Sequence, residues 1–66
     1  MQPIDSTYVN AIGYQDEILA IYFTNGSLYY YLAVPEKTFS ELLQAPCKGL
    51  FIIQHIKNKF EAKQIL

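Results

Sequence analysis

The chain has little charge of either sign and no arginine, which sets it apart from proteins that coat duplex DNA. Its 66 residues include five lysines and six acidic residues, for a net charge of −1 at pH 7. Binding along duplex DNA usually requires a basic field, because contacts to phosphates release counterions. We therefore expect no duplex DNA partner.

Cysteine and long apolar runs are also scarce. The single cysteine, Cys47, excludes a disulfide within the chain and is typical of a reducing compartment. No apolar run approaches the ~18 residues of a membrane span, and residues 1–7 have neither a basic nor an apolar signal region. The sequence thus predicts a cytoplasmic protein without a membrane partner.

Apolar residues, in contrast, are abundant. Hydrophobic residues make up 52% of the chain and aromatic residues 15%, with six tyrosines and four phenylalanines. This composition excludes a disordered chain. Its length, without repeats or linkers, indicates one domain over residues 1–66. The apolar content exceeds what one small core can hold, which favours a homo-oligomer or a large binding face.

A β-hairpin is predicted in the middle of the chain, where two apolar runs flank Asn25-Gly26. Two registers fit this turn. A two-residue turn places Tyr22, Tyr29 and Tyr31 together on the face away from the core. A three-residue loop that ends in a left-handed glycine moves Tyr29 and Tyr31 to the core face. The sequence alone leaves both registers open.

A further strand is predicted before the hairpin. Residues 8–15 are aromatic and β-branched, and Asp16-Glu17 forms a short polar break after them. A two-residue turn at this break would place Ile12 opposite Ile21. The sheet is thus predicted to be a three-stranded antiparallel meander.

Two helices are predicted after the meander. Residues 35–44 begin with proline and repeat apolar residues with helical spacing, and residues 47–60 form a second apolar helical segment. The apolar stripe of the second helix is expected to consist of Leu50, Ile53, Ile56 and Phe60. Phe51 and Ile52 lie off this stripe, which predicts them for an oligomer interface. The predicted fold class is α+β, with both helices packed on one face of the sheet.

Short motifs occur along nearly the whole chain in an order that matches a known family. They are Ser6, Ile12-Gly13-Tyr14, Leu19, Ile21, Phe23, Gly26, Tyr29-Tyr30-Tyr31, Val34-Pro35, Leu42, Ala45, Gly49-Leu50-Phe51 and Ile56. In these motifs the chain resembles the KTSC domain, a module at the C-terminus of some lysyl-tRNA synthetases that also stands alone in bacteria and phages. The resemblance implies an RNA-binding role, suggested by the synthetase context, and a bacterial or phage-infected cytoplasm.

The candidate ligand site combines aromatic rings with positive charge. Tyrosines on an open sheet face can stack on bases, and a lysine near a helix N-terminus can hold an anion. The candidate ligand-binding residues are Tyr22, Tyr29, Tyr31, Lys48, Lys57 and His55. The same tyrosines would also suit a face buried in an oligomer, and Lys48 could simply be solvated.

No pattern in the sequence predicts catalysis. Cys47 and His55 are eight residues apart, which places them about 12 Å apart along a helix, too far for direct proton transfer. With one histidine and one cysteine, no metal-ligand cluster is expected either. We therefore expect no enzyme, no metal and no cofactor.

Three functions remain open. The first is a binding module for RNA or a nucleotide, acting through the tyrosine-rich face. The second is a homo-oligomer that sequesters a small, for example cyclic, nucleotide signal, as a phage counter-defence protein would. The third is a protein–protein interaction adaptor.

Overall fold

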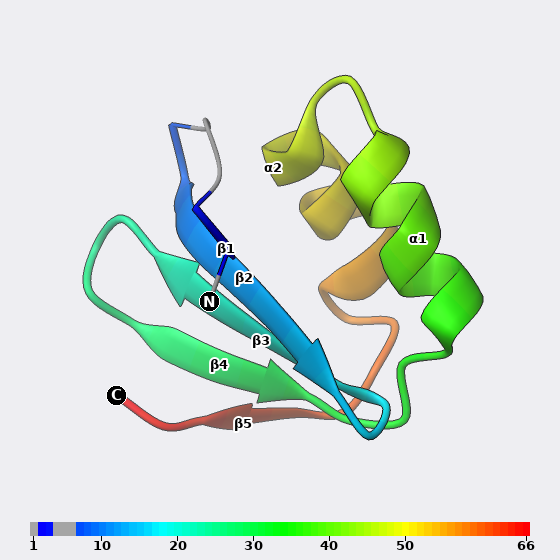
Figure 1. The fold of residues 1–66 in the computed structure, drawn as a ribbon. Helices are drawn as coiled ribbons and strands as arrows, with labels where there is room; N and C mark the ends of the chain where they lie inside the picture. Colours follow the sequence, from blue (N-terminus) through cyan, green and yellow to red (C-terminus); the bar gives the residue numbers. More distant parts are fainter. Residues whose placement is uncertain (1, 4–6) are drawn as a thin grey trace.

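An antiparallel sheet with helices on one of its faces forms the fold in the computed structural model (Figure 1). The structure describes residues 2–3 and 7–66. The strands are β1 (Gln2–Pro3), β2 (Val9–Gln15), β3 (Ile18–Phe23), β4 (Leu28–Tyr31) and β5 (Ala62–Gln64), which neighbour one another in this order. The helices are α1 (Glu36–Gln44), α2 (Lys48–Phe51) and the π-helical turn η1 (Ile52–Ile56), which continues α2 without a break.

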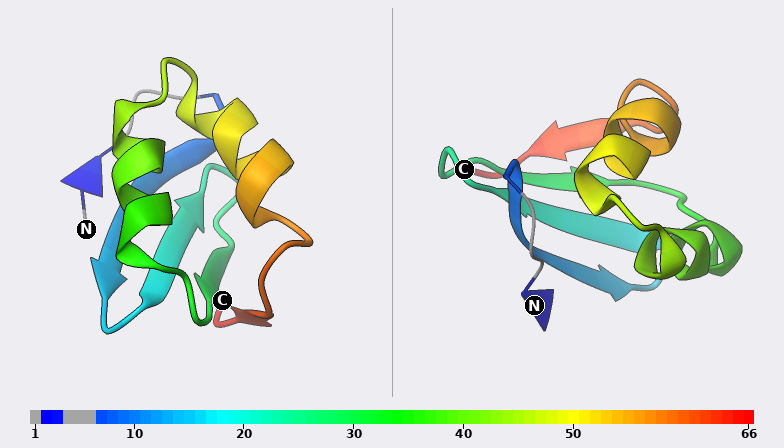
Figure 2. Two further views of the ribbon diagram at one scale, coloured as in Figure 1. Left: turned by 90° about the vertical axis from the view of Figure 1, so that its right-hand side faces the viewer. Right: turned by 90° about the horizontal axis from the view of Figure 1, so that it is seen from above.

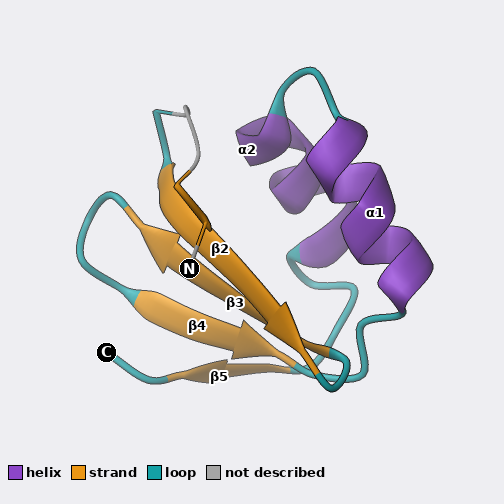
Figure 3. Cartoon of the chain, viewed as in Figure 1, coloured by secondary structure: helices purple, strands orange, loops and turns teal. Residues whose placement is uncertain are grey.

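The predicted α+β class is confirmed, but the sheet has more strands than the predicted three. Besides the meander β2–β3–β4, it has β5 at one edge and the two-residue β1 at the other. The sheet has four strands if the two-residue β1 is not counted. Figure 2 shows the helices on one side of the sheet, and in Figure 3 no described helix or strand covers its other face. No helix in the described part of the chain is long and apolar enough to span a membrane.

The turn between β2 and β3 has two residues, as predicted. Asp16 and Glu17 have φ values of 53° and 64°, the left-handed pair that a two-residue hairpin turn with matching twist requires. Ile12 consequently pairs with Ile21. Because both isoleucines point toward the helices, this register places the apolar side chains of two strands in one layer.

The loop between β3 and β4 has three residues. The Phe23 N–H donates to the carbonyl oxygen of Ser27 at 2.8 Å, which encloses residues 24–26. Gly26 has a φ of 92°, where other residues are strained. The Ser27 N–H also donates to Oδ1 of Asn25 at 2.9 Å. The side chain of Asn25 thus stabilises the loop type that shifts the second strand by one residue.

This register determines where the tyrosines lie. Tyr29 pairs with Ile21 and Tyr31 with Leu19, so both tyrosines share the helix-covered face with these aliphatic residues. Tyr31 is only 4% exposed and belongs to the core. Tyr22 remains on the open face. Of the two registers that the sequence left open, the three-residue loop is the one observed, and the alternative that placed the three tyrosines together on one exposed face is excluded.

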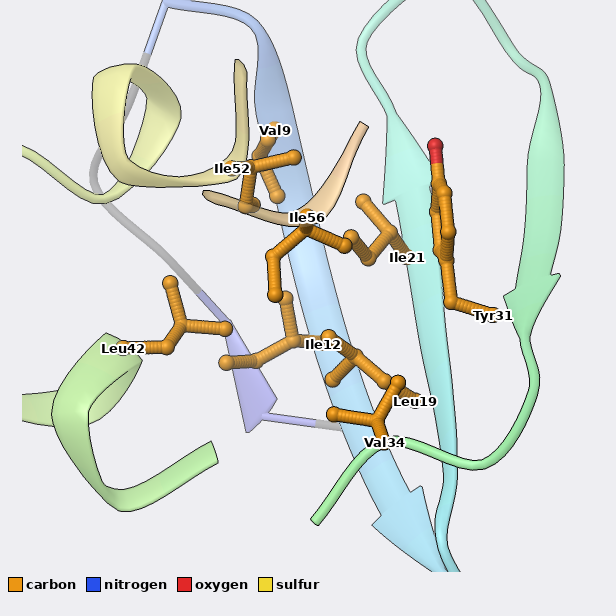
Figure 4. Close-up of a cluster of buried hydrophobic side chains, with 9 residues drawn as sticks. All are labelled: Val9, Ile12, Leu19, Ile21, Tyr31, Val34, Leu42, Ile52 and Ile56. Carbon is orange, nitrogen blue, oxygen red and sulfur yellow. The ribbon is translucent and has the colours of Figure 1, made fainter. Parts of the chain in front are cut away.

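The core fills the space between the sheet and the helices. Its buried side chains are Val9, Ile12, Leu19, Ile21, Tyr31, Val34, Leu42, Ile52 and Ile56 (Figure 4). Among them, the ring of Tyr31 lies beside Ile21 at one end of the aliphatic cluster. Burial at this density explains how so short a chain can fold, since each fully buried aliphatic side chain contributes about 1.5–3 kcal/mol.

The second helix, α2 with η1, ends at Ile56 and does not reach Phe60 as predicted. The Lys57 N–H donates to the carbonyl oxygen of Ile52 at 2.7 Å, a bond five residues back that widens the last turn. Asn58 then adopts a left-handed φ of 66°, which asparagine tolerates better than most residues. The chain reverses there and continues into β5, whose residues sequence periodicity did not identify.

The buried face of the second helix also differs from the predicted stripe. Ile52 and Ile56 are 1% and 0% exposed, whereas Leu50 and Ile53 are about half exposed. The predicted interface role of Ile52 is wrong, because its side chain is enclosed within a single chain. Phe51 is half-buried and packs against the core. Apolar residues surround most of this helix, so their spacing could not show which face is covered.

Substituting neighbouring isoleucines will test which face of the second helix is buried. Ile52→Ala should lower the free energy of unfolding by about 2–5 kcal/mol, because it leaves a cavity in the core. Ile53→Ala, the matched control on the exposed face, should change it by only about 0.5 kcal/mol. Urea denaturation followed by circular dichroism measures both. Equal losses would contradict the observed orientation of the helix.

Candidate functional site

A hollow of about 430 Å³ opens between the β3–β4 loop, the end of the second helix and β5. We call it the aromatic hollow. Its lining residues are Phe23, Asn25, Ser27, Tyr29, Tyr31, Lys57, Asn58, Phe60 and Ala62. Three segments that are distant in sequence meet here, because β5 pairs with β4 and brings the turn after the second helix alongside the hairpin.

Aromatic rings form one wall of this hollow. The ring of Phe23 meets that of Tyr29 edge-on, with centroids 5.7 Å apart and an interplanar angle of 86°. Tyr29 and Tyr31 are stacked at 6.3 Å and 28°. The three rings point to the same side of the sheet because of the bulged register. Each ring therefore restrains its neighbour, and the wall is in place before any ligand binds.

The polar side chains around the hollow can donate hydrogen bonds to a ligand. Because Oδ1 of Asn25 accepts the Ser27 N–H, the side-chain nitrogen of Asn25 is left to donate. Lys57 adds an ammonium group at the exposed turn after the second helix, and no acidic residue in the described part of the chain lines the hollow. Donors and one positive charge next to aromatic rings suit a planar ligand that carries carbonyl or phosphate oxygens.

The phenol groups of two tyrosines titrate above their usual range. Burial, and to a smaller extent the neighbouring Tyr29, raises the pKa of Tyr31. Partial burial and the carboxylates of Glu17 and Glu36 raise the pKa of Tyr14, whose hydroxyl donates to the Val34 carbonyl oxygen at 2.6 Å. Both phenols therefore stay protonated at neutral pH and can act as donors, but not as general bases.

The structure brings together only some of the ligand-binding residues predicted from sequence. Tyr29, Tyr31 and Lys57 line the aromatic hollow, although Tyr31 contributes little exposed surface. Tyr22 lies on the opposite face of the sheet. Lys48 lies at the start of α2, where its Nζ donates to the carbonyl oxygen of Ala45 at 3.1 Å, and it lines a different hollow.

Cys47 and the candidate ligand-binding residue His55 do not line the aromatic hollow. Cys47 is an exposed free thiol, and His55 packs its exposed ring on Phe51 with centroids 4.7 Å apart. Over residues 2–3 and 7–66, no three side chains of the His, Cys, Asp and Glu types gather as metal ligands would.

Sequence reasoning missed several residues of the hollow. Asn25 was identified only as a turn former, and Phe60 was assigned to the stripe of a helix that ends before it. Phe23 was identified as one of the family motifs and not as a site residue, whereas in the structure it is half-buried and lines the hollow. The polar run Lys57-Asn58-Lys59 was the one signal that could have indicated a turn and thus a site beside it.

Three known proteins resemble this chain over most of its length. The KTSC domain family model matches residues 5–60. A protein from Tsukamurella paurometabola is 41% identical over 64 residues, covering 94% of this chain and 96% of that protein. A lysine–tRNA ligase from Nostoc sp. is 32% identical over 63 residues, 92% of this chain but only 11% of the ligase. The crystal structure of a KTSC domain protein from Yersinia pestis has a TM-score of 0.93 and 37% identity, covering 98% of this chain and 94% of that one.

Replacing the buried phenol should change how stability depends on alkaline pH. Because the folded state raises the pKa of Tyr31 above the usual 10.0, its contribution to stability is complete below pH 10. It is lost as the pH rises from there through the raised pKa. We expect the free energy of unfolding of Tyr31→Phe to decline less than that of the unmodified protein between pH 9 and about 11.

The comparison needs a control, because lysines titrate in the same range. They are identical in both proteins and cancel from the difference. Tyr22→Phe, which removes an exposed hydroxyl on the open face, should follow the unmodified protein. If the free energy of unfolding of Tyr31→Phe declines with pH as much as that of the unmodified protein, the Tyr31 phenol is not buried in solution.

Proposed function

The chain belongs to the KTSC domain family, and from this premise we propose that it is a non-enzymatic binding module that holds a nucleotide of RNA in the aromatic hollow. The observation that carries the proposal is the wall of aromatic rings with Lys57 beside it and no acidic side chain among the described residues of the lining. A base offers a flat apolar surface to such a wall, and its phosphate offers a partner for the lysine.

Each of these contacts would contribute a measurable part of the binding free energy. Stacking of a base on an aromatic side chain contributes about 1–3 kcal/mol, and it tolerates any base because each has a π-face. The half-buried ring of Tyr29 lies in the middle of the wall and is the natural stacking partner. The amide nitrogen of Asn25 can donate to a base carbonyl, which adds selectivity.

The relatives support RNA over other nucleic acids. A segment like this chain occurs in a lysine–tRNA ligase, a protein named for its action on tRNA. The net charge of −1 does not suit a long duplex, whose binding depends on many phosphate contacts. An unpaired nucleotide, whose base is free to enter a hollow, fits the small size of the site.

Binding of mononucleotides and short single-stranded RNA, measured by tyrosine fluorescence and calorimetry, tests the proposal. Tyr29→Leu, which keeps apolar volume but removes the ring, should weaken binding about 5- to 150-fold, the equivalent of 1–3 kcal/mol. Lys57→Gln should also weaken binding and should lower the slope of log affinity against log salt by about 0.7. The effect of Tyr29→Leu should hardly change with salt.

Two variants outside the hollow serve as matched controls. Tyr22→Leu removes a ring from the open face, and Lys37→Gln removes a charge from exposed α1. Both should bind like the unmodified protein. Affinities that are equal in all four variants, or no binding of any nucleotide, would rule out the aromatic hollow as a nucleotide site.

A second candidate is a homo-oligomer, favoured by the open face of the sheet. Ile18, Tyr22 and Ile65 on this face are 36%, 36% and 43% exposed. Tyr22 pairs with Leu28, whose carbonyl oxygen accepts the Ile65 N–H, so their side chains lie next to one another on the sheet. Contiguous exposed apolar surface often marks an interaction site. Copies paired through this face could enclose and sequester a small nucleotide.

The molecular mass in solution tests whether the protein is a homo-oligomer. Light scattering at about 100 μM should give a multiple of the 7.6 kDa chain mass if the open face pairs. Tyr22→Glu should then restore the mass of one chain, because a desolvated carboxylate opposes association. Lys37→Gln should leave the mass unchanged. A single-chain mass for the unmodified protein would exclude the homo-oligomer.

A further inference from the structure

The aromatic hollow continues into two further hollows along the second helix. A second hollow of about 380 Å³ shares Phe23, Asn25 and Lys57 with it. A third, of about 480 Å³ at the start of α2, shares Tyr8, Gly49 and Ile53 with the second. Adjoining hollows with common walls form one groove, which we call the helix groove. It runs from β5 past the β3–β4 loop to the residues that precede α2.

The groove is positively charged although the whole chain is not. Lys57 lines the first two hollows and Lys48 the third, and among residues 2–3 and 7–66 no acidic side chain lines any of them. Acidic residues of the sheet are concentrated in the β2–β3 turn, at the opposite end of the strands from the β3–β4 loop (Figure 1). Glu36 lies at that end too, since it acts with Glu17 on the pKa of Tyr14. Three of the six acidic residues therefore lie away from the groove, although Glu61 follows Phe60 in the chain, so the positive charge is a property of the groove lining and not of a whole face.

Aromatic rings occur along the groove as well as at its first hollow. Phe23 separates the first hollow from the second, and Tyr8, 61% exposed, lies between the second and the third. Rings alternating with lysines along a channel are the arrangement by which proteins bind a single strand, the rings contacting bases and the lysines following the backbone. A lone nucleotide would occupy only one of the hollows.

We infer that the helix groove binds single-stranded RNA of about three nucleotides, one in each hollow. Each hollow, at 380–480 Å³, lies within the range of small-ligand sites, roughly 300–1,000 Å³. Lys57 holds the phosphate between the first two nucleotides, and Lys48 holds the phosphate that enters the third hollow. The inference rests on the proposed function and specifies its ligand: a short unpaired strand, since bases must be unstacked to enter separate hollows.

A length series of RNA distinguishes this ligand from a mononucleotide. We would measure the affinity of a nucleoside 5′-monophosphate and of oligonucleotides of two to six residues of one sequence by calorimetry at low salt. Affinity should rise with each nucleotide up to three and then stay level apart from the statistical gain of extra registers. A duplex of the same sequence should bind at least tenfold more weakly than its single strand.

Two lysine variants locate the strand in the groove. Lys48→Gln should weaken binding of the trinucleotide and lower its salt slope by about 0.7, while leaving mononucleotide binding unchanged. Lys57→Gln should weaken both ligands. Lys37→Gln is the control, and circular dichroism confirms that Lys48→Gln, which loses the bond to Ala45, remains folded.

The outcomes distinguish a failure of the helix groove from a failure of the proposed function. A mononucleotide that binds as tightly as the trinucleotide, with Lys48→Gln without effect, overturns the groove and leaves the aromatic hollow as the whole site. Equal binding of duplex and single strand overturns the groove as well. If no ligand of the series binds, the proposed function fails and the inference fails with it.

Discussion

The register of β4 against β3 is the constraint on which the rest of the structure depends. It is determined within a three-residue loop, where Gly26 takes a φ of 92° and Asn25 accepts the Ser27 N–H. A shift by one residue would turn every side chain of β4 to the other face. Tyr31 would leave the core and Tyr29 would leave the aromatic wall. Both the packing beneath the helices and the candidate site thus depend on one loop.

The end of the second helix is the complementary constraint. Because the last turn is wide and Asn58 is left-handed, the chain reverses after Ile56 and returns along β4 as β5. The same reversal carries Lys57 and Phe60 to the rim of the aromatic hollow. Had the helix continued to Phe60 as its apolar content suggested, the hollow would lack one wall and the sheet would end at β4.

Sequence reasoning predicted the layers of this fold better than their details. Apolar, aromatic and β-branched runs between turn residues identified three strands, and the register at Asp16-Glu17 followed from the two-residue turn. The hairpin loop remained ambiguous because Asn25-Gly26 fits two turn types that differ only in long-range packing. The face of the second helix could not be predicted either, since apolar residues surround it and only contact with the sheet decides between Ile52 and Ile53.

The candidate site was harder to predict than the fold, because its residues share no sequence pattern. Tyr29 and Lys57 belong to elements that meet only through the pairing of β4 with β5, a strand that the sequence did not reveal. The near-neutral net charge argued against a duplex DNA partner but could not show where the charges lie. In the fold, Asp16 and Glu17 lie at the β2–β3 turn, while Lys48 and Lys57 line a groove to which the described residues contribute no acidic side chain. In so small a domain, the local field at a site is set by where the chain turns and not by its total charge.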